Sequence, residues 1–180
     1  MRIIAGKYRA KILQSPKNGV VRPTADRARE ALFNILSSKF GNSWEDCRFL
    51  DVFAGTGAVG LEALSRGAQK VGFVDINTIN VLQNVKLFAQ EKEKIKIYKF
   101  DARNLPPAKE KYNLVFLDAP YEKNLSESAL EQLFCKCWLN NAAMIAVETQ
   151  KNEKFEAPKV FEVVDERIYG PAKFRFLRLS

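Results

Sequence analysis

The sequence contains no histidine, three cysteines and no long apolar run. The lack of histidine excludes Ser-His-Asp and Cys-His catalysis, a histidine general base and histidine-based metal sites. A small, odd number of cysteines is typical of a reducing compartment and argues against a disulfide scaffold. Any chemistry must therefore use carboxylates, tyrosines, lysines, backbone groups or a cofactor, and we expect no metal.

Membrane insertion is not expected either. The longest apolar run, 142–147, is six residues long, whereas a bilayer crossing needs about 18. The first residues include no apolar segment of the kind found in signal peptides. We therefore expect a cytoplasmic protein without a membrane partner, and 180 residues are enough for one domain.

Positive charge is concentrated near the N-terminus. The net charge is +8, and the first 30 residues contain eight basic and two acidic residues, which leaves only +2 for the other 150. A basic segment beside a near-neutral domain is typical of polyanion binders, although a solvated basic surface is the alternative interpretation. The residues that we expect to contact nucleic-acid phosphates are Lys7, Arg9, Lys11, Arg22 and Arg27.

Apolar periodicity predicts alternating strands and helices. The expected strands are 48–53, 70–75, 95–101, 113–118, 142–148, 160–169 and 174–179, and the expected helices are 24–39, 58–66, 78–91 and 126–137. Residues 2–14 suggest a short hairpin or extended arm. The pattern indicates an α/β fold with a mostly parallel seven-stranded sheet, helices on both faces and an antiparallel C-terminal hairpin.

Five of these strands end at or near a carboxylate. Open α/β sheets bind ligands at the carboxyl ends of their strands. The ligand-facing rim should therefore be acidic, and its members are Asp51, Asp75, Asp101, Asp118 and Glu148.

The segment after the first strand has a dinucleotide-type glycine pattern. Gly55, Gly57 and Gly60 have the spacing G-x-G-x-x-G, and Asp75 lies 20 residues beyond the first glycine. The glycines permit a tight turn, and the acid suits a pair of ribose hydroxyls. The pattern alone does not separate NAD from S-adenosylmethionine.

Asp51 favours S-adenosylmethionine. A carboxylate so close to the loop would repel a pyrophosphate, whereas it would attract the ammonium and sulfonium of S-adenosylmethionine. Asp101 is placed to accept from an adenine amino group. The full set of expected cofactor contacts is Asp51, Phe53, Gly55, Thr56, Gly57, Asp75, Ile76, Asp101 and Ala102.

A second loop follows the fourth expected strand, with the sequence Asp118, Ala119, Pro120 and Tyr121. It resembles the [Asp/Asn]-Pro-Pro-[Tyr/Phe] motif of amino-group methyltransferases, with Ala119 in place of the first proline. The Asp118 carboxylate and a backbone carbonyl would each accept one N–H of an exocyclic amine and so direct its lone pair at the methyl group. Tyr121 would stack on the base, worth about 1–3 kcal/mol. We expect these four residues to be catalytic.

The N-terminal third carries the most specific resemblance. Arg-Ile-Ile-Ala-Gly at 2–6 and Arg-Pro-Thr-Ala-Asp-Arg-Ala-Arg-Glu-Ala-Leu-Phe-Asn at 22–34, together with both loops, resemble the RsmD-type bacterial 16S rRNA guanine-N2 methyltransferases. The resemblance covers essentially the whole chain. It implies a Rossmann-like class I methyltransferase fold, with a basic arm at 1–23 and a catalytic core at 24–180. Arg29 and Glu30 are not assigned to RNA binding, because they can instead pair within the fold.

The resemblance further implies methyl transfer from S-adenosylmethionine to N2 of a guanine in 16S rRNA, yielding S-adenosylhomocysteine. The implied partner is a partly or fully assembled 30S particle, and we expect a monomer. One alternative is a DNA adenine-N6 methyltransferase, which usually needs a target-recognition region that this chain has no room for. The others are a non-catalytic RNA-binding module and a protein glutamine methyltransferase; the latter would favour Asn over Asp118.

Overall fold

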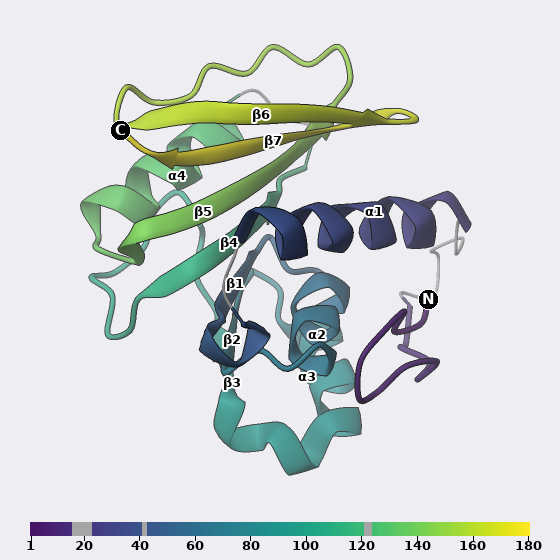
Figure 1. Ribbon diagram of the computed structural model, residues 1–180. Helices are drawn as coiled ribbons and strands as arrows, with labels where there is room; N and C mark the ends of the chain where they lie inside the picture. The colour runs from purple at the N-terminus through teal and green to yellow at the C-terminus, as the bar shows by residue number, and fades with distance from the viewer. Residues whose placement is uncertain (16–22, 41–42, 121–123) are drawn as a thin grey trace.

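The computed structural model describes residues 1–15, 23–40, 43–120 and 124–180. A seven-stranded sheet with the order β3-β2-β1-β4-β5-β7-β6 forms its centre (Figure 1). The strands are β1 (Arg48–Val52), β2 (Lys70–Val74), β3 (Ile95–Tyr98), β4 (Tyr112–Asp118), β5 (Leu139–Gln150), β6 (Phe161–Tyr169) and β7 (Ala172–Leu179). The helices are α1 (Pro23–Phe40), α2 (Ala58–Ser65), α3 (Ile79–Val85) and α4 (Leu125–Cys135), with 3₁₀ segments η1 (Trp44–Asp46) and η2 (Lys86–Lys94).

Strands β1 to β5 pair in parallel, and β1 lies between β2 and β4. Because β2 and β3 continue the sheet on one side of β1, and β4 and β5 on the other, the direction of winding reverses between β1 and β4. Ligands of open α/β sheets bind at such a reversal, at the carboxyl ends of the strands. The topology therefore places the candidate site at the ends of β1 and β4.

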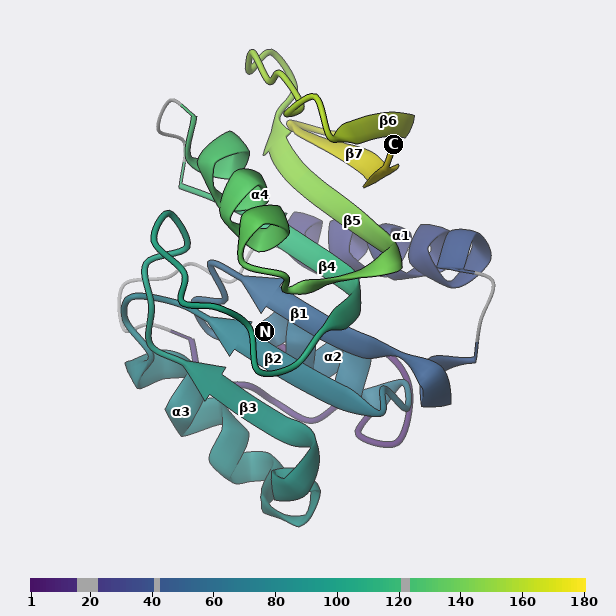
Figure 2. The ribbon, with the colours of Figure 1, turned by 90° about the vertical axis from the view of Figure 1, so that its left-hand side faces the viewer.

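Helices cover both faces of the sheet (Figure 2). Phe33 of α1, Leu61 of α2 and Val81 of α3 belong to one buried cluster, whereas Leu130 and Leu133 of α4 belong to the other. Strands buried on both faces need apolar residues without strict alternation, as β1 shows with four buried residues in succession. None of the helices in the described ranges combines the length and apolar content needed to cross a membrane.

The C-terminal strands form the expected hairpin. Strand β7 pairs antiparallel with both β5 and β6. The turn between β6 and β7 includes Gly170, whose φ of 59° is accessible to glycine at little cost. The mostly parallel seven-stranded sheet with an antiparallel edge is thus confirmed.

The helix expected at 78–91 is divided into α3 and η2. Phe88 interrupts the helical backbone with φ −121° and ψ 34°. Its ring is fully buried and meets the Tyr8 ring edge-on, with 4.9 Å between centroids. Because Tyr8 comes from the N-terminal segment, this contact has no signature in the local helical pattern.

The N-terminal segment is a hairpin-like loop closed by one antiparallel bridge between Arg2 and Ile12. It packs on α2, where the buried carboxylate of Glu62 accepts the backbone N–H groups of Ile4 at 2.7 Å and Ala5 at 3.0 Å. A Cβ atom on Gly6 would lie 1.9 Å from the Ser65 carbonyl oxygen. Glycine is therefore required for this close approach.

Candidate active site

The loop between β1 and α2 turns sharply at the carboxyl end of the sheet. Phe53, Gly55 and Gly57 have φ angles of 60°, 55° and 76°. A Cβ atom on Gly57 would lie 2.7 Å from Cγ2 of Val81 in α3. The glycine pattern thus serves both the turn and the close packing of the loop against α3.

Asp51 lies in β1, buried beneath this loop. Its Oδ2 accepts the backbone N–H of Gly60 at 2.8 Å, in the first turn of α2. Burial raises the pKa of Asp51 well above its ordinary value, and the charges of Asp118 and Asp75 add to the rise against the opposing effect of the Gly60 hydrogen bond. A ligand cation near this carboxylate would favour its charged form.

Asp75, directly after β2, holds the same loop. Its Oδ2 accepts the N–H of Gly55 at 2.8 Å, and its Oδ1 accepts the N–H of Asn77 at 2.8 Å. An ionised carboxylate has about four lone-pair sites, so each oxygen retains capacity for a ligand hydroxyl. The pair of ribose hydroxyls predicted from the sequence is compatible with this arrangement.

A space of about 600 Å³, the outer cleft, opens beside the ends of β2, β3 and β4. Ile76 and Phe100 remain 67% and 38% exposed there, and the Phe100 ring stacks on Tyr98 with 6.3 Å between centroids. Apolar side chains left open within a cleft suit a flat aromatic ligand. The lining residues are Phe53, Gly55, Val74, Asp75, Ile76, Asn77, Phe100, Asp101, Ala102, Arg103, Asp118, Ala119, Pro120 and Leu125.

The outer cleft thus brings together most of the cofactor residues predicted from the sequence. Phe100 was not among the cofactor residues predicted from the sequence. The feature that could have identified it is an aromatic residue next to a carboxylate near the end of a strand. Asp101 already has a partner, because Nη2 of Arg103 lies 2.7 Å from its Oδ2. The side-chain hydrogen bond from Arg103 is the main cause that lowers the pKa of Asp101. An adenine amino group would therefore share this carboxylate with Arg103.

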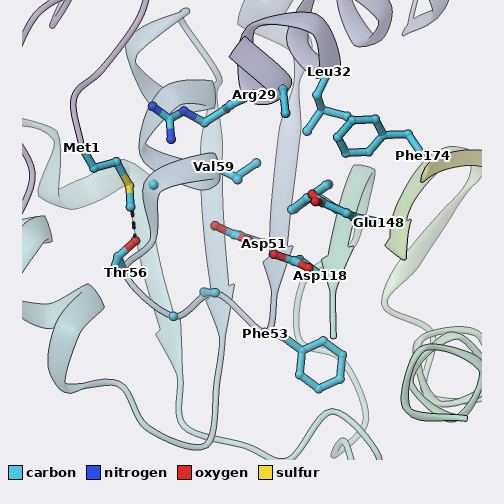
Figure 3. A pocket seen from close by; sticks show the side chains of 15 residues that line it. Met1, Arg29, Leu32, Asp51, Phe53, Thr56, Val59, Asp118, Glu148 and Phe174 are labelled. Atoms are coloured by element: carbon cyan, nitrogen blue, oxygen red, sulfur yellow. Dashed lines mark hydrogen bonds between the residues drawn. The ribbon is translucent and has the colours of Figure 1, made fainter. Parts of the chain in front are cut away.

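A second space of about 280 Å³, the inner cavity, lies between the loop after β1 and helix α1 (Figure 3). It has Phe53, Gly55 and Asp118 in common with the outer cleft, so the two spaces meet at these residues. The rest of its lining is Met1, Ala28, Arg29, Leu32, Asp51, Ala54, Thr56, Ala58, Val59, Phe116, Glu148 and Phe174. Met1 and the residues of α1 were not expected here, since sequence does not show where a preceding helix crosses the sheet.

The loop after β4 lies where the two spaces meet. Asp118 ends β4, and Ala119 and Pro120 line the outer cleft directly after it. The structure therefore places the first three predicted catalytic residues beside the predicted cofactor loop. Tyr121 lies outside the described residues.

Asp118 faces a second carboxylate. It is opposite Glu148 in the register of β4 and β5, and both line the inner cavity with Asp51 (Figure 3). Desolvation raises the pKa of Asp118 to about 6, with the charge of Glu153 as a second cause. Desolvation and then Asp118 raise the pKa of Glu148 to about 8. Glu148 was expected on the acidic rim but not among the site residues, since strand register is needed to pair it with Asp118.

The predicted phosphate-binding residues lie in two places. Arg9 and Arg27 line a groove of about 500 Å³ between the N-terminal loop and α1, and Arg2 joins them there. Lys7 is instead ion-paired with Glu91 at 2.6 Å, while Lys11 donates to the Leu87 carbonyl at 2.5 Å, on η2. The groove also contains acidic residues, Asp26 and Glu30. Arg22 lies outside the described residues.

A metal centre has no candidate in the described ranges, where no three His, Cys, Asp or Glu side chains are grouped to hold an ion.

Comparison with known proteins gives a family for this chain. The family model described as "Conserved hypothetical protein 95" matches residues 1–178. The ribosomal RNA small subunit methyltransferase D of Haemophilus influenzae is 35% identical, over 97% of this chain and 92% of that protein. Its namesake from Escherichia coli K12 is 33% identical, over 97% and 88%.

Solved structures agree with these matches. A putative methyltransferase from Escherichia coli superposes with a TM-score of 0.84 and 29% identity, covering 100% of this chain and 98% of that one. A ribosomal protein L11 methylase from Lactobacillus delbrueckii subsp. bulgaricus shares the fold alone, with a TM-score of 0.68 and 14% identity over 97% and 88% of the chains. The sheet and its helices thus form a class I methyltransferase fold, and the chain belongs to the RsmD family.

Proposed function

We propose that this protein is an S-adenosylmethionine-dependent rRNA methyltransferase that modifies the N2 amino group of a guanine in 16S rRNA. One observation carries the proposal: Asp118 stands where an open cleft with apolar walls meets a cavity lined by three carboxylates. The cleft suits the adenosine part of the cofactor. The carboxylates suit its cationic part.

The residues present fit this cofactor in charge as well as in shape. Desolvation raises the pKa of Asp51, Asp118 and Glu148, so the charged form of each carboxylate would gain from a nearby positive charge. A bound sulfonium and ammonium would supply that charge and lower all three pKa values. A pyrophosphate would raise them further. The fit therefore favours S-adenosylmethionine over a dinucleotide.

When bound, S-adenosylmethionine would supply the methyl group and leave as S-adenosylhomocysteine, and the amino nitrogen that receives the methyl group would give one proton to the Asp118 carboxylate. The chain's residues hold that nitrogen in position. The Asp118 carboxylate accepts one N–H, and the carbonyl of Ala119 is the candidate acceptor for the other. The lone pair then points at the methyl group rather than into the ring, which makes positioning the main catalytic contribution of the loop.

Glu148 supports guanine over adenine as the target base. Guanine presents two neighbouring donors on its Watson–Crick edge, N1–H and the N2 amino group, and two neighbouring carboxylates can accept from both. With a cation bound in the cavity, Glu148 is favoured in its ionised form, and adenine would then place its N1 acceptor against the carboxylate and leave both groups without a hydrogen. The pair of Asp118 and Glu148 therefore matches the guanine edge.

The RNA substrate is supported by the relatives and by charge. Two relatives at 35% and 33% identity are named for small-subunit ribosomal RNA. The groove containing Arg2, Arg9 and Arg27 offers guanidinium groups for phosphates outside the catalytic cavity. We propose that the protein acts as a monomer in the cytoplasm on a 30S particle, and that the target base leaves its stack at a cost of a few kcal/mol.

The test uses S-adenosylmethionine with a labelled methyl group, offered with 30S particles, naked 16S rRNA or duplex DNA. We expect label in the ribosomal substrates only, and none with the Asp118→Ala variant. Equal labelling by Asp118→Ala would show that the loop is not catalytic. Labelling of DNA alone would favour the adenine alternative. RNA binding without labelling of any substrate would favour a non-catalytic module.

A further inference from the structure

Arg29 of α1 is a buried arginine at the wall of the inner cavity. Its side chain is 7% exposed, and it extends from α1 toward Met1 above Val59 (Figure 3). The three carboxylates that line the cavity, Asp51, Asp118 and Glu148, lie on the side of the cavity away from the Arg29 guanidinium. The cavity is therefore polarised, with a guanidinium at one end and acids at the other.

The described residues satisfy only part of this guanidinium. Nη2 donates to the Arg2 carbonyl at 2.7 Å and to Oδ1 of Asp26 at 2.9 Å. Nε is buried and has no partner within the described ranges. A guanidinium has five N–H donors, and leaving one buried without an acceptor costs about 1–3 kcal/mol or more. An acceptor from a ligand would remove this cost.

The ligand that fits such a cavity is zwitterionic. Its cationic groups would face the carboxylates, and its anionic group would reach Arg29. An isolated anion would be repelled by the three acids, and an isolated cation would leave Nε without an acceptor. The amino-acid end of S-adenosylmethionine carries one ammonium and one carboxylate, next to the sulfonium. It therefore has the charge pattern that the cavity presents.

We propose that Arg29 binds the carboxylate of the methionine part of S-adenosylmethionine. This inference rests on the proposed cofactor and assigns one chemical group of it to one side chain. Arginine suits the task because its planar donors match a carboxylate and its charge persists at every working pH. Asp26 and the Arg2 carbonyl then act as positioning groups, since they hold Nη2 and leave Nε for the ligand.

Calorimetric titration with two ligands tests this assignment. S-adenosylhomocysteine has the carboxylate, and its decarboxylated analogue keeps the adenosine, sulfur and amine but lacks it. We expect Arg29→Gln to weaken S-adenosylhomocysteine about 10- to 100-fold, the range of a hydrogen bond to a charged group. Binding of the decarboxylated analogue should stay within about twofold. Arg178→Gln, at an exposed arginine of β7 outside both spaces, should change neither affinity.

Two results would overturn the assignment. Equal weakening of both ligands by Arg29→Gln would show that Arg29 only supports the fold, and unchanged binding of both would show that it contacts neither. Arg29→Lys keeps the positive charge on a single nitrogen, so it should weaken S-adenosylhomocysteine binding by an intermediate factor and leave binding of the decarboxylated analogue unchanged. This variant tests the assignment even if Arg29→Gln does not fold. Failure of the unmodified protein to bind either ligand would instead contradict the proposed cofactor itself.

Discussion

Asp118 and Glu148 are directly opposite each other on the parallel strands β4 and β5, and both line the inner cavity. Their pKa values are raised to about 6 and about 8, chiefly by desolvation. In the protein without ligand, the two carboxyl groups thus titrate as a pair, at a higher pH than isolated carboxyl groups. The pair responds both to pH and to any cation in the cavity.

The first prediction concerns pH and stability. Carboxyl groups of the unfolded chain titrate near 4, whereas Asp118 and Glu148 in the folded protein titrate near 6 and 8. The folded state therefore holds these protons more tightly. The resulting contribution to stability is fully present below about pH 4 and is lost as the pH rises through 6 and 8. Glu148→Gln cannot ionise. We expect it to raise the melting temperature at pH 8.5 by about 2–4 °C, which is about 1 kcal/mol in a chain of this size. At pH 5 the change should be near zero. Glu131→Gln, at an exposed position of α4, is the control. If Glu148→Gln shifted the melting temperature equally at both pH values, the link between the raised pKa of Glu148 and stability would be contradicted.

The second prediction concerns how the N-terminal loop is held. Glu62 is fully buried and accepts from Ile4, Ala5 and Arg66. Glu62→Ala would leave all three donors without their acceptor, and breaking a buried pair of this kind costs about 3–5 kcal/mol. We expect a melting temperature lower by about 6–20 °C in thermal unfolding. Glu93→Ala, at an exposed position of η2, should change the melting temperature little. If Glu62→Ala lowered it by an equally small amount, other contacts would mainly hold the N-terminal loop.

The third prediction separates steric contact from backbone strain in the cofactor loop. Gly57 and Gly170 both have positive φ, 76° and 59°, but only a Cβ at Gly57 meets a neighbour, Val81 at 2.7 Å. Both alanine variants carry the strain of a positive φ. We expect Gly57→Ala to weaken S-adenosylhomocysteine binding at least about 10-fold, equivalent to about 1.4 kcal/mol, and Gly170→Ala to leave it unchanged. If Gly57→Ala and Gly170→Ala bound S-adenosylhomocysteine with equal affinity in calorimetry, the assignment of this loop to the cofactor site would be contradicted.

The fourth prediction concerns RNA binding at the groove of Arg2, Arg9 and Arg27. Truncation of the N-terminal loop would remove buried Ile3 and Tyr8 from the core, so point substitutions test the surface better. Each phosphate contact on single-stranded RNA contributes about 0.7 to the slope of log K against log salt. The double variant Arg9→Ala, Arg27→Ala should therefore lower the slope by about 1.4 in binding titrations at several salt concentrations. Lys159→Ala, exposed and outside the groove, is the control. A slope unchanged by the double variant would place the RNA elsewhere.

The sequence predicted the sheet and the acidic rim because both follow from local patterns. Uninterrupted apolar strands and the glycines after β1 are visible in short windows, and each strand-end carboxylate can be read in the same way. Arg29 and Glu148 could not be placed, since the first depends on where α1 crosses the sheet and the second on the register of β4 and β5. The ring of Phe88, where the helix is interrupted, meets Tyr8, about 80 positions away in the chain, and such a contact cannot be read from a short window.

Charge gave the least secure predictions for a related reason. Lys7 and Lys11 are as basic as Arg9 in the sequence, yet they find acceptors on η2. A count of charges cannot tell which cations have partners within the fold. Only the folded N-terminal loop separates the cations that face η2 from those that face the groove.

Nucleoside analysis identifies the atom that receives the methyl group. Ribosomal RNA would be methylated with the unmodified protein and with Asp118→Ala, digested to nucleosides and separated by mass spectrometry against standards. We expect about one N2-methylguanosine per 16S rRNA molecule with the unmodified protein and none with Asp118→Ala. N6-methyladenosine, a ring-nitrogen product, or N2-methylguanosine formed equally well by Asp118→Ala would contradict the proposed function.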